Sequence, residues 1–384
     1  MTKDRIFLIA IFLTILAVPI SSFLVWYFTS EKILDVLVID KTVPKADRVE
    51  HKSFFWLLNQ HNYRKSDNSR YRYKKDYLGF FPLKPYDEKK YKITRVRLAE
   101  IDSLSDRYDV VYFADTYGVY KGDWYDNLNR FERIIKIEGG FTNNDYLLMK
   151  SMVAKKKTFI AEFNLLASPT SPLIREKTEN LLNIKWLGWT GKFMERLDTL
   201  NNDNLPDWIV RKYKSNHDGT WPYQGPGIVF IKGNKIVVLS KDEDLDFEFP
   251  ILHTRKEYRD HYQLPENIKY PFWFEITFPY RDQEIVSSLQ ILVNNKGEDK
   301  LRKEGIPSIF PAVIHHEDEY SEWYYFTGDF ADNPVNIWSS YFAGTDAATF
   351  LFHAGKYEDR RVFFWEYYNP LIKNILENIY DSIE

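Results

Sequence analysis

Acidic and amide side chains follow several predicted strands of the chain at the points where those strands end. The apolar segment 108–114 ends on Asp115, and earlier and later apolar segments end on Asp40 and Glu162. Because the carboxyl ends of parallel strands meet at one edge of a sheet, we expect a ligand site at that edge. The candidate ligand-binding residues are Asp40, Asp115, Thr116, Tyr117, Glu162, Asn164, Trp189, Asp329 and Asp332.

Two carboxylates among these residues could hydrolyse a glycosidic bond. One carboxyl group with a raised pKa would donate a proton, and the other would act as base or nucleophile, at a separation of about 5 to 10 Å. The catalytic candidates are Glu162 with Asp115 or Asp329. Each of these residues could instead cap a helix or hold a loop, which Asp and Asn commonly do at strand ends.

Several other chemistries are excluded by the composition. The chain has no Cys, which removes thiol nucleophiles, thiolate metal sites and disulfides. Neither a G-x-S-x-G elbow nor a glycine-rich nucleotide loop occurs. The adjacent His315 and His316 point to opposite faces of a strand, so they cannot bind one ion together. We therefore expect no metal and no cofactor.

The aromatic content of 17% allows two interpretations. Flat rings could line a carbohydrate-binding surface, whereas most aromatic side chains in proteins serve packing. Trp189 and Trp221 lie in the Gly- and Pro-containing segments 186–193 and 206–227, which are predicted to be loops. Exposed rings beside carboxylates would favour a sugar site, and loops packed onto the domain are the alternative.

Charge and length narrow the class of protein. The net charge of −3 and the pI near 6.3 leave no global basic field, so nucleic acid is not an expected partner. At 384 residues the chain can form one large domain or two smaller ones.

Residues 6–28 carry no charged side chain, which predicts a membrane anchor. At about 1.5 Å per residue a helix of this length crosses a hydrocarbon core of roughly 30 Å, and Trp26 with Tyr27 would form an interfacial belt. A cleaved signal peptide is the alternative, although no A-x-A site follows. Lys3 and Arg5 place the N-terminus in the cytoplasm, so a single-pass cell-membrane protein with an extracytoplasmic domain is expected.

Strands and helices alternate through the first half of the chain, which predicts an α/β fold with a parallel sheet. The second half is less regular, with a hairpin at 228–239 and a closing helix interrupted at Pro370. The predicted helices are 50–64, 142–155, 171–183, 297–303 and 360–383, and residues 66–92 are predicted to be a surface excursion. The predicted divisions are a stub with a transmembrane anchor at 1–30, an α/β domain at 31–340, and a helical segment packed on it at 341–384.

The order of these elements resembles that of class I glutamine-amidotransferase-like domains. The segments that carry the resemblance are FADTYG, AEFN, PAVIH and WYYFTGD. The chain is most similar to the trehalose-utilisation-type domains and to the equivalent domain of family 42 β-galactosidases. The resemblance covers roughly residues 33 to 332, and it implies a three-layer, flavodoxin-like sheet.

The chain departs from this family at the nucleophile. Amidotransferases place a cysteine after the strand that corresponds to TFIAEFN, and this chain has Phe163 or Asn164 there. Neither side chain can form a thioester, so glutamine hydrolysis by that route is excluded. We therefore expect a non-catalytic role, either binding a cell-envelope or exported glycan or supporting partner enzymes. The alternatives are a glycan hydrolase with paired carboxylates and a structural subunit of a membrane complex.

Overall fold

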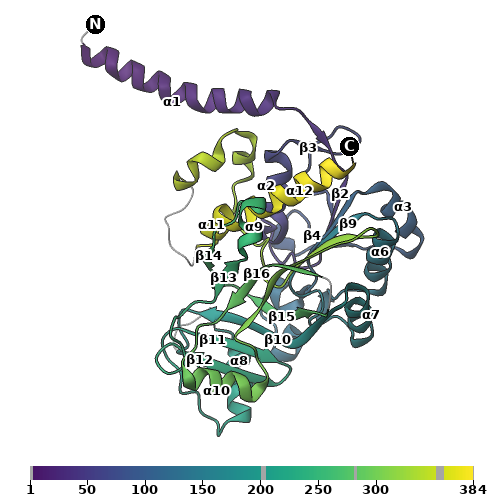
Figure 1. Cartoon of the computed structure of the whole chain (residues 1–384), viewed down its shortest axis with the longest axis vertical. Helices are drawn as coiled ribbons and strands as arrows, with labels where there is room; N and C mark the ends of the chain where they lie inside the picture. The colour runs from purple at the N-terminus through teal and green to yellow at the C-terminus, as the bar shows by residue number, and fades with distance from the viewer. Residues whose placement is uncertain (1–2, 200–204, 281–282, 352–358, 384) are drawn as a thin grey trace.

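A computed structural model describes residues 3–199, 205–280, 283–351 and 359–383. Its main feature is a ten-stranded mixed sheet with the order β14-β13-β16-β17-β18-β9-β6-β2-β4-β5 (Figure 1). Strands β18, β9, β6, β2 and β4 run parallel, and the strands at both ends are antiparallel. The strands are β2 (Val36–Asp40), β4 (Tyr77–Pro82), β5 (Tyr91–Thr94), β6 (Val110–Asp115), β9 (Thr158–Ala161), β13 (Ile251–Thr254), β14 (Asn267–Lys269), β16 (Glu284–Gln290), β17 (Ile309–Glu317) and β18 (Glu322–Phe326). The predicted α/β class is confirmed.

Alternation along the central strands separates two cores, one on each face of the main sheet. In β2, Val36 and Val38 belong to one core, and Leu37 and Ile39 belong to the other. Side chains alternate between the two faces of a strand, and both faces of a parallel sheet are covered, so the strand is apolar throughout. The first core is covered by α2 (Val49–Gln60) and α12 (Asn369–Ile383), and the second by α3 (Ile101–Arg107), α6 (Asn143–Ala154) and α7 (Pro172–Leu182).

Local sequence signals explain two of these helices. Thr142 caps α6 in a reciprocal capping box with Asp145. Ser171 caps α7, and Pro172 occupies the first helical position. A backbone N–H at this position would have no acceptor within the helix, so proline, which lacks the N–H, is tolerated there. The predicted helices at 142–155 and 171–183 are confirmed.

A second, four-stranded antiparallel sheet has the order β12-β11-β10-β15. It consists of β10 (Ile184–Met194), β11 (Gly227–Lys232), β12 (Lys235–Ser240) and β15 (Phe274–Pro279), with α8 (Asp207–Asn216) and α10 (Asn295–Glu304) beside it (Figure 1). The predicted hairpin is confirmed as β11 and β12. The predicted loops at 186–193 and 206–227 are wrong, because they contain β10 and α8. The predicted excursion at 66–92 is also wrong, because β4 is a strand of the main sheet.

Shorter elements complete the chain. They are β1 (Lys32–Ile33), β3 (Tyr63–Arg64), β7 (Val119–Tyr120), β8 (Lys136–Glu138), α4 (Lys121–Trp124), α5 (Arg130–Arg133), α9 (Lys256–Tyr262), α11 (Arg360–Phe363) and the 3₁₀ turns η1 (Tyr86–Glu88), η2 (Leu98–Glu100), η3 (Ile337–Tyr341) and η4 (Thr345–Leu351). The domain divisions at residues 30 and 340 stay predictions.

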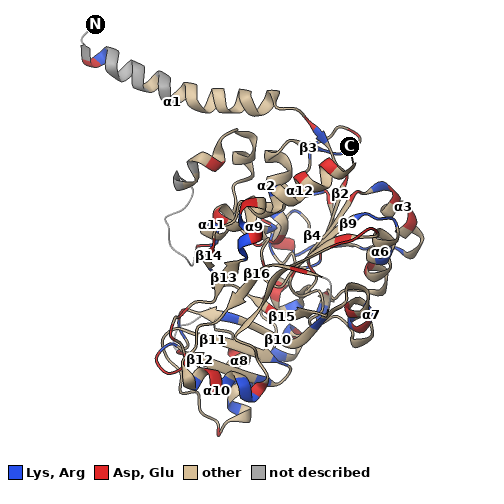
Figure 2. Ribbon diagram, in the orientation of Figure 1, with Lys and Arg blue, Asp and Glu red and all other residues tan. Residues whose placement is uncertain are grey.

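The first helix, α1 (Lys3–Phe28), extends away from the sheets and carries charge only at its start (Figure 2). Trp26 near its end is 2% exposed, and its indole N–H donates to the carbonyl oxygen of Asn59 at 3.0 Å. The predicted interfacial role of this ring is therefore wrong, since the ring packs against protein. Over the residues that the structure describes, no helix combines the length and apolar character needed to cross a membrane. The predicted transmembrane anchor is thus not found.

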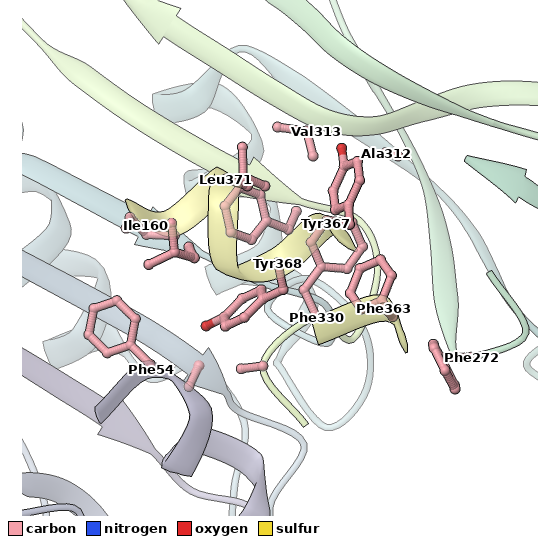
Figure 3. Close-up of a cluster of buried hydrophobic side chains, with 14 of the residues drawn as sticks. Phe54, Ile160, Phe272, Ala312, Val313, Phe330, Phe363, Tyr367, Tyr368 and Leu371 are labelled. Carbon is pink, nitrogen blue, oxygen red and sulfur yellow. The ribbon is translucent and has the colours of Figure 1, made fainter. Parts of the chain in front are cut away.

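The C-terminal helical segment packs into the first core. A π-helical turn, η5 (Phe364–Tyr368), joins α11 to α12, and Pro370 lies in the first turn of α12. The predicted interruption is thus a widened turn directly before the proline, which cannot donate a backbone hydrogen bond. Figure 3 shows the rings of Phe330, Phe363 and Tyr367 gathered together, and Phe330 and Phe363 have centroids 5.0 Å apart.

Candidate functional site

The carboxyl edge of the parallel strands holds two adjacent aspartates. Asp40 ends β2 and Asp115 ends β6, and the two residues are partners in the strand register. Each carboxylate also accepts a nearby backbone N–H, from Thr42 to Asp40 at 2.9 Å and from Tyr117 to Asp115 at 2.7 Å. One oxygen of each side chain therefore holds the loop that follows its own strand. This is the loop-holding role that the sequence analysis gave as the alternative to ligand binding.

Asp40 forms a buried pair with His51 of α2. Asp40 Oδ2 lies 2.5 Å from His51 Nδ1, and His51 Nε2 lies 2.8 Å from the carbonyl oxygen of Tyr73. A carbonyl can only accept, so Nε2 carries a proton and donates it. The contact between Nδ1 and Oδ2 then needs one further proton, held by the ring or by the carboxyl. Burial raises the pKa of Asp40, although His51 opposes this shift.

Glu50 precedes His51 in the first turn of α2 and faces the same group of acids. Burial raises its pKa well above the ordinary value, and repulsion from Asp40, Asp332 and Asp115 adds to the shift. Its Oε2 is buried and has no hydrogen-bond partner among the described residues. Glu50 therefore has a buried oxygen whose hydrogen-bonding capacity is not used by the described residues.

Asp329 and Asp332 follow β18 and share one cation. Arg360 Nη2 lies 2.6 Å from Asp329 Oδ2 and 3.8 Å from Asp332 Oδ2. Burial raises the pKa of Asp332 to about 6 against the opposing effect of Arg360. Burial on its own would lower the pKa of Arg360. The charges of Asp329 and Asp332 outweigh this effect and raise the pKa above its ordinary value.

Asp115 lies between these groups. Burial raises its pKa well above the ordinary range, and the charges of Asp40 and Asp329 raise it further. The structure thus brings together Asp40, Asp115, Asp329 and Asp332, and adds Glu50. The raised pKa values of Asp40, Glu50, Asp115 and Asp332 mean that these carboxyl groups take up a proton more readily than a free carboxyl group, and a protonated carboxyl group can donate as well as accept hydrogen bonds. We call Asp40, Glu50, Asp115, Asp329 and Asp332 the edge carboxylates.

Glu162 lies at the same edge but has a different environment. Its side chain is 1% exposed. Oε1 accepts the hydroxyl of Tyr112, and Oε2 accepts the backbone N–H groups of Phe330 and Ala331, each at 3.1 Å. Burial raises the pKa of Glu162 well above its ordinary value. Both of its oxygens are engaged, so Glu162 holds the 329–332 segment against the sheet instead of facing an open space.

The turn after β9 contains one residue with an uncommon backbone conformation. Asn164 adopts a φ of 71°, in the left-handed region that non-glycine residues rarely occupy. The hydroxyl of Thr116 donates to the carbonyl oxygen of Asn164 at 3.1 Å, and the N–H of Asn164 bonds to Glu275. Thr116 and Asn164 therefore fix the turn, and their ligand contact stays a prediction.

The aromatic candidates divide into buried and accessible rings. Trp189 is 1% exposed in the core, so its ring is not available to a ligand and that part of the site prediction is wrong. Tyr117 is 42% exposed. Trp273, which the sequence did not single out, is partly exposed, and the ammonium group of Lys192 lies 5.4 Å from its ring centroid. Asp329 donates its N–H to the carbonyl oxygen of Trp273 at 3.0 Å, which places the main chains of the two residues side by side.

Gly79 allows β4 to approach the edge. It is the register partner of Asp40, and its φ is 141°. A Cβ atom at this position would lie 1.6 Å from the carbonyl oxygen of Asp40. A glycine is therefore required here for both conformation and space.

Replacing Gly79 with alanine is expected to lower the free energy of unfolding by more than about 2 kcal/mol, because backbone strain and a backbone clash combine. Urea denaturation measures the change. Gly233→Ala is the matched control, since its φ is 58° and nothing lies within 4 Å of the added carbon. Equal losses in the two variants would contradict the clash.

The structure offers no metal site within the ranges it describes, where no group of three or more His, Asp or Glu side chains could hold an ion. His315 instead stacks on Tyr324 with centroids 4.4 Å apart, and His316 lies over Trp323. The two rings lie on opposite faces of β17, as the alternation of strand side chains requires.

Sequence reasoning missed Glu50, His51, Lys192, Trp273 and Arg360. One sequence signal could have indicated Glu50 and His51. They lie in the first turn of a helix that follows a parallel strand, and such a turn lies at the carboxyl edge of the sheet, where α/β proteins bind ligands. No sequence signal indicated Arg360, since only the packing of α11 brings its side chain to Asp329.

Comparisons with known proteins complete the description. No protein-family profile matches the chain, and no curated protein matches it in sequence. A cytoplasmic protein from Salmonella typhimurium LT2 aligns over 91% of this chain and 99% of its own, with 10% identity and a TM-score of 0.37. A putative ThuA-like protein from Bacteroides uniformis aligns over 79% and 84%, with 9% identity and a TM-score of 0.34. A β-galactosidase from Bacillus circulans aligns over 79% and 30%, with 10% identity and a TM-score of 0.32. Similarities this low assign neither a family nor an activity to the chain.

Proposed function

We propose that this protein binds a hydroxyl-rich ligand, a short glycan, at the edge carboxylates without cleaving it. The observation that carries the proposal is the group of buried acids with raised pKa values around the unpartnered Oε2 of Glu50. A carboxyl group accepts hydrogen bonds when it is ionised and can also donate one when it is protonated, which suits the hydroxyl groups of a sugar.

The surroundings of these acids support the same ligand class. Trp273 provides a partly exposed ring beside Asp329, and such rings stack on the flat faces of sugars. Lys192 and Arg360 lie next to the aspartates, so an anionic substituent on the glycan would also find a cation. Arg360 already pairs with Asp329 and lies near Asp332, which leaves Glu50 and Asp115 as the groups to meet the ligand.

Both oxygens of Glu162 already accept hydrogen bonds, and this favours binding of a glycan over its hydrolysis. A catalytic acid must release its proton to the substrate, whereas both oxygens of Glu162 are held by Tyr112 and by backbone N–H groups. The hydrolase alternative therefore passes to Asp115, whose raised pKa suits an acid, with Asp40 as its neighbour.

We propose further that the chain is a glutamine-amidotransferase-like domain without a nucleophile. The left-handed Asn164, three residues after the end of β9, supports this, because amidotransferases carry their cysteine at that turn. Attachment to a membrane, an extracytoplasmic location and the support of partner enzymes stay predictions.

A glycan array with the full chain tests the binding proposal. The wild-type protein is expected to bind a subset of glycans, and a Glu50→Gln, Asp115→Asn variant is expected to bind the same glycans at least about tenfold more weakly, since two hydrogen-bonding groups are altered. A Glu176→Gln, Asp102→Asn variant is the matched control, because both positions are exposed helix residues away from the edge.

Equal binding by the wild type and the edge variant would overturn the proposed site. Release of new reducing ends by the wild type, lost in Asp115→Asn, would favour the hydrolase alternative over simple binding.

A further inference from the structure

Lys192 and Trp273 point to the same face of the four-stranded sheet. In the antiparallel pairing of β10 with β15, Gly191 is the register partner of Phe274. Continuing this register by one residue places Lys192 opposite Trp273, and the ammonium group of Lys192 lies 5.4 Å from the centroid of the Trp273 ring. Residues directly opposite each other in an antiparallel pair share one face, so the two side chains lie side by side.

The row that these two residues begin continues to Asp329. Phe274 forms an antiparallel bridge with Gly328, and the N–H of Asp329 donates to the carbonyl oxygen of Trp273 at 3.0 Å. Trp273 and Asp329 are therefore opposite each other, on the face that Lys192 shares. Phe274 points to the other face and is 0% exposed, whereas Lys192, Trp273 and Asp329 are partly exposed. The row thus faces away from the core and ends on one of the edge carboxylates.

Lys192 has no ion-pair partner among the described residues. Asp329, at the other end of the row, is instead bonded to Arg360 at 2.6 Å. Burial lowers the pKa of Lys192 and the charge of Arg360 lowers it further, so the neighbouring acids do not compensate for the loss of water. A partly buried cation without a counter-charge is unfavourable, and an anion bound beside it would remove that cost.

Trp273 fixes the position of this cation. The ring of Phe163, in the turn after β9, lies nearly parallel to the indole, with centroids 6.5 Å apart and 20° between the planes. Phe163 is 7% exposed, so it supports the indole from the protein side. The attraction between the ammonium group and the indole then holds Lys192 in place without a carboxylate that a ligand would have to displace.

We propose that Lys192 binds a monoanionic substituent of the glycan, a carboxylate or a sulfate ester, and so selects acidic sugars over neutral ones. This inference rests on the proposed function, because it concerns the same site. One unpaired ammonium group matches one negative charge, whereas a phosphate monoester carries about −1.5 to −2.

The edge carboxylates do not prevent an anion from binding at Lys192. Neighbouring strands lie about 4.8 Å apart, so the main chains of Lys192 and Asp329 are separated by roughly 10 Å across Trp273. Arg360 offsets the charge of Asp329 at that end of the row. The anionic substituent thus lies at one end of the row, while the hydroxyl groups of the same glycan meet the edge carboxylates at the other.

The test compares each acidic oligosaccharide with its own neutral form. Short oligosaccharides of galacturonate, glucuronate and mannuronate are titrated beside the same compounds after reduction of their carboxyl groups. A neutral oligosaccharide with a sulfate ester forms a third arm. The full-length wild-type protein is expected to bind at least one acidic form about tenfold more tightly than its neutral form, and salt should weaken this preference.

Lys192→Met removes the charge and keeps an unbranched stem, so the preference is expected to fall to about twofold or less. Lys192→Arg should retain the preference, because it retains the charge. Lys232→Met is the matched control and should behave as the wild type. Its ammonium group lies 5.5 Å from the centroid of the Trp189 ring, but Lys232 is exposed and Trp189 is buried.

Equal binding of the acidic and neutral forms by the wild type, or a full preference in Lys192→Met, would overturn this inference and leave the proposed function standing. Loss of both forms in Lys192→Met would show that the lysine supports the fold instead of selecting the ligand, which would also overturn it. Absence of binding to every oligosaccharide would overturn the proposed function and this inference with it. Tighter binding of the sulfated than of the carboxylated forms would support the inference and identify the substituent as a sulfate ester.

Discussion

Glu162→Ala is expected to lower the free energy of unfolding by about 3 kcal/mol, because it leaves three buried donors without their acceptor. Those donors are the hydroxyl of Tyr112 and the backbone N–H groups of Phe330 and Ala331. Glu162→Gln should cost only about 1 kcal/mol, since the amide oxygen still accepts and the amide nitrogen can donate to Tyr112.

Chemical denaturation of the two variants and the wild type measures this difference. Glu176→Ala on α7 is the control, because Glu176 is exposed and changes at such positions usually stay within about 0.5 kcal/mol. If alanine and glutamine at position 162 cost the same small amount, Glu162 does not hold the 329–332 segment.

The stability of the protein is expected to fall as the pH rises from about 5 to about 8. Burial raises the pKa of Glu275 to about 7 and that of Asp332 to about 6. A group whose pKa is higher in the folded state binds its proton more tightly there. Its stabilising effect is therefore complete below the unfolded value and is lost as the pH rises through the folded value.

Glu275→Gln isolates one of these groups. For Glu275, the change from 4.5 to about 7 corresponds to on the order of 3 kcal/mol between the protonated and ionised forms. Glutamine cannot ionise and still accepts from Tyr325 and Thr277, so the variant should be the more stable protein at about pH 8.

Denaturation midpoints at several pH values check this expectation, with Glu176→Gln as the exposed control. A variant whose stability declines as steeply as that of the wild type would show that Glu275 does not titrate in this range.

The helices of the first half were predictable because their signals are local. Thr142 with Asp145 and Ser171 with Pro172 mark helix starts within four residues of chain, and the structure confirms both. The apolar strand at 108–114 was equally clear, since β-branched and aromatic residues fill a strand that is buried on both faces.

The strands that were not predicted contain glycines that are needed because distant parts of the chain pack close to them. Gly191 indicated a loop, but a Cβ there would lie 2.5 Å from the ring of Phe274, so the glycine admits a neighbouring side chain within β10. Gly79 in β4 has the corresponding role beside Asp40. No local pattern distinguishes such a glycine from one in a turn.

The candidate site could likewise be predicted only in part from the sequence. Strand-end acids could be found because they follow apolar runs, and the structure gathers Asp40, Asp115 and Asp329. The burial of Trp189 and the engagement of Glu162 depend on partners far away in the sequence, such as Phe330. Whether the gathered residues bind a ligand stays a prediction.

The hydroxyl of Tyr112 bonds Glu162 and also lies 2.9 Å from the hydroxyl of Tyr368 in the C-terminal segment. An unbroken line of hydrogen bonds thus runs from η5 through the middle of the sheet to the loop that carries Asp329 and Asp332. Segments joined in this way open together rather than separately, as one cooperative unit. Opening of the π-helical turn at Tyr368 would therefore loosen the loop that carries Asp329 and Asp332, and anything that holds this loop in place would in turn stabilise that turn.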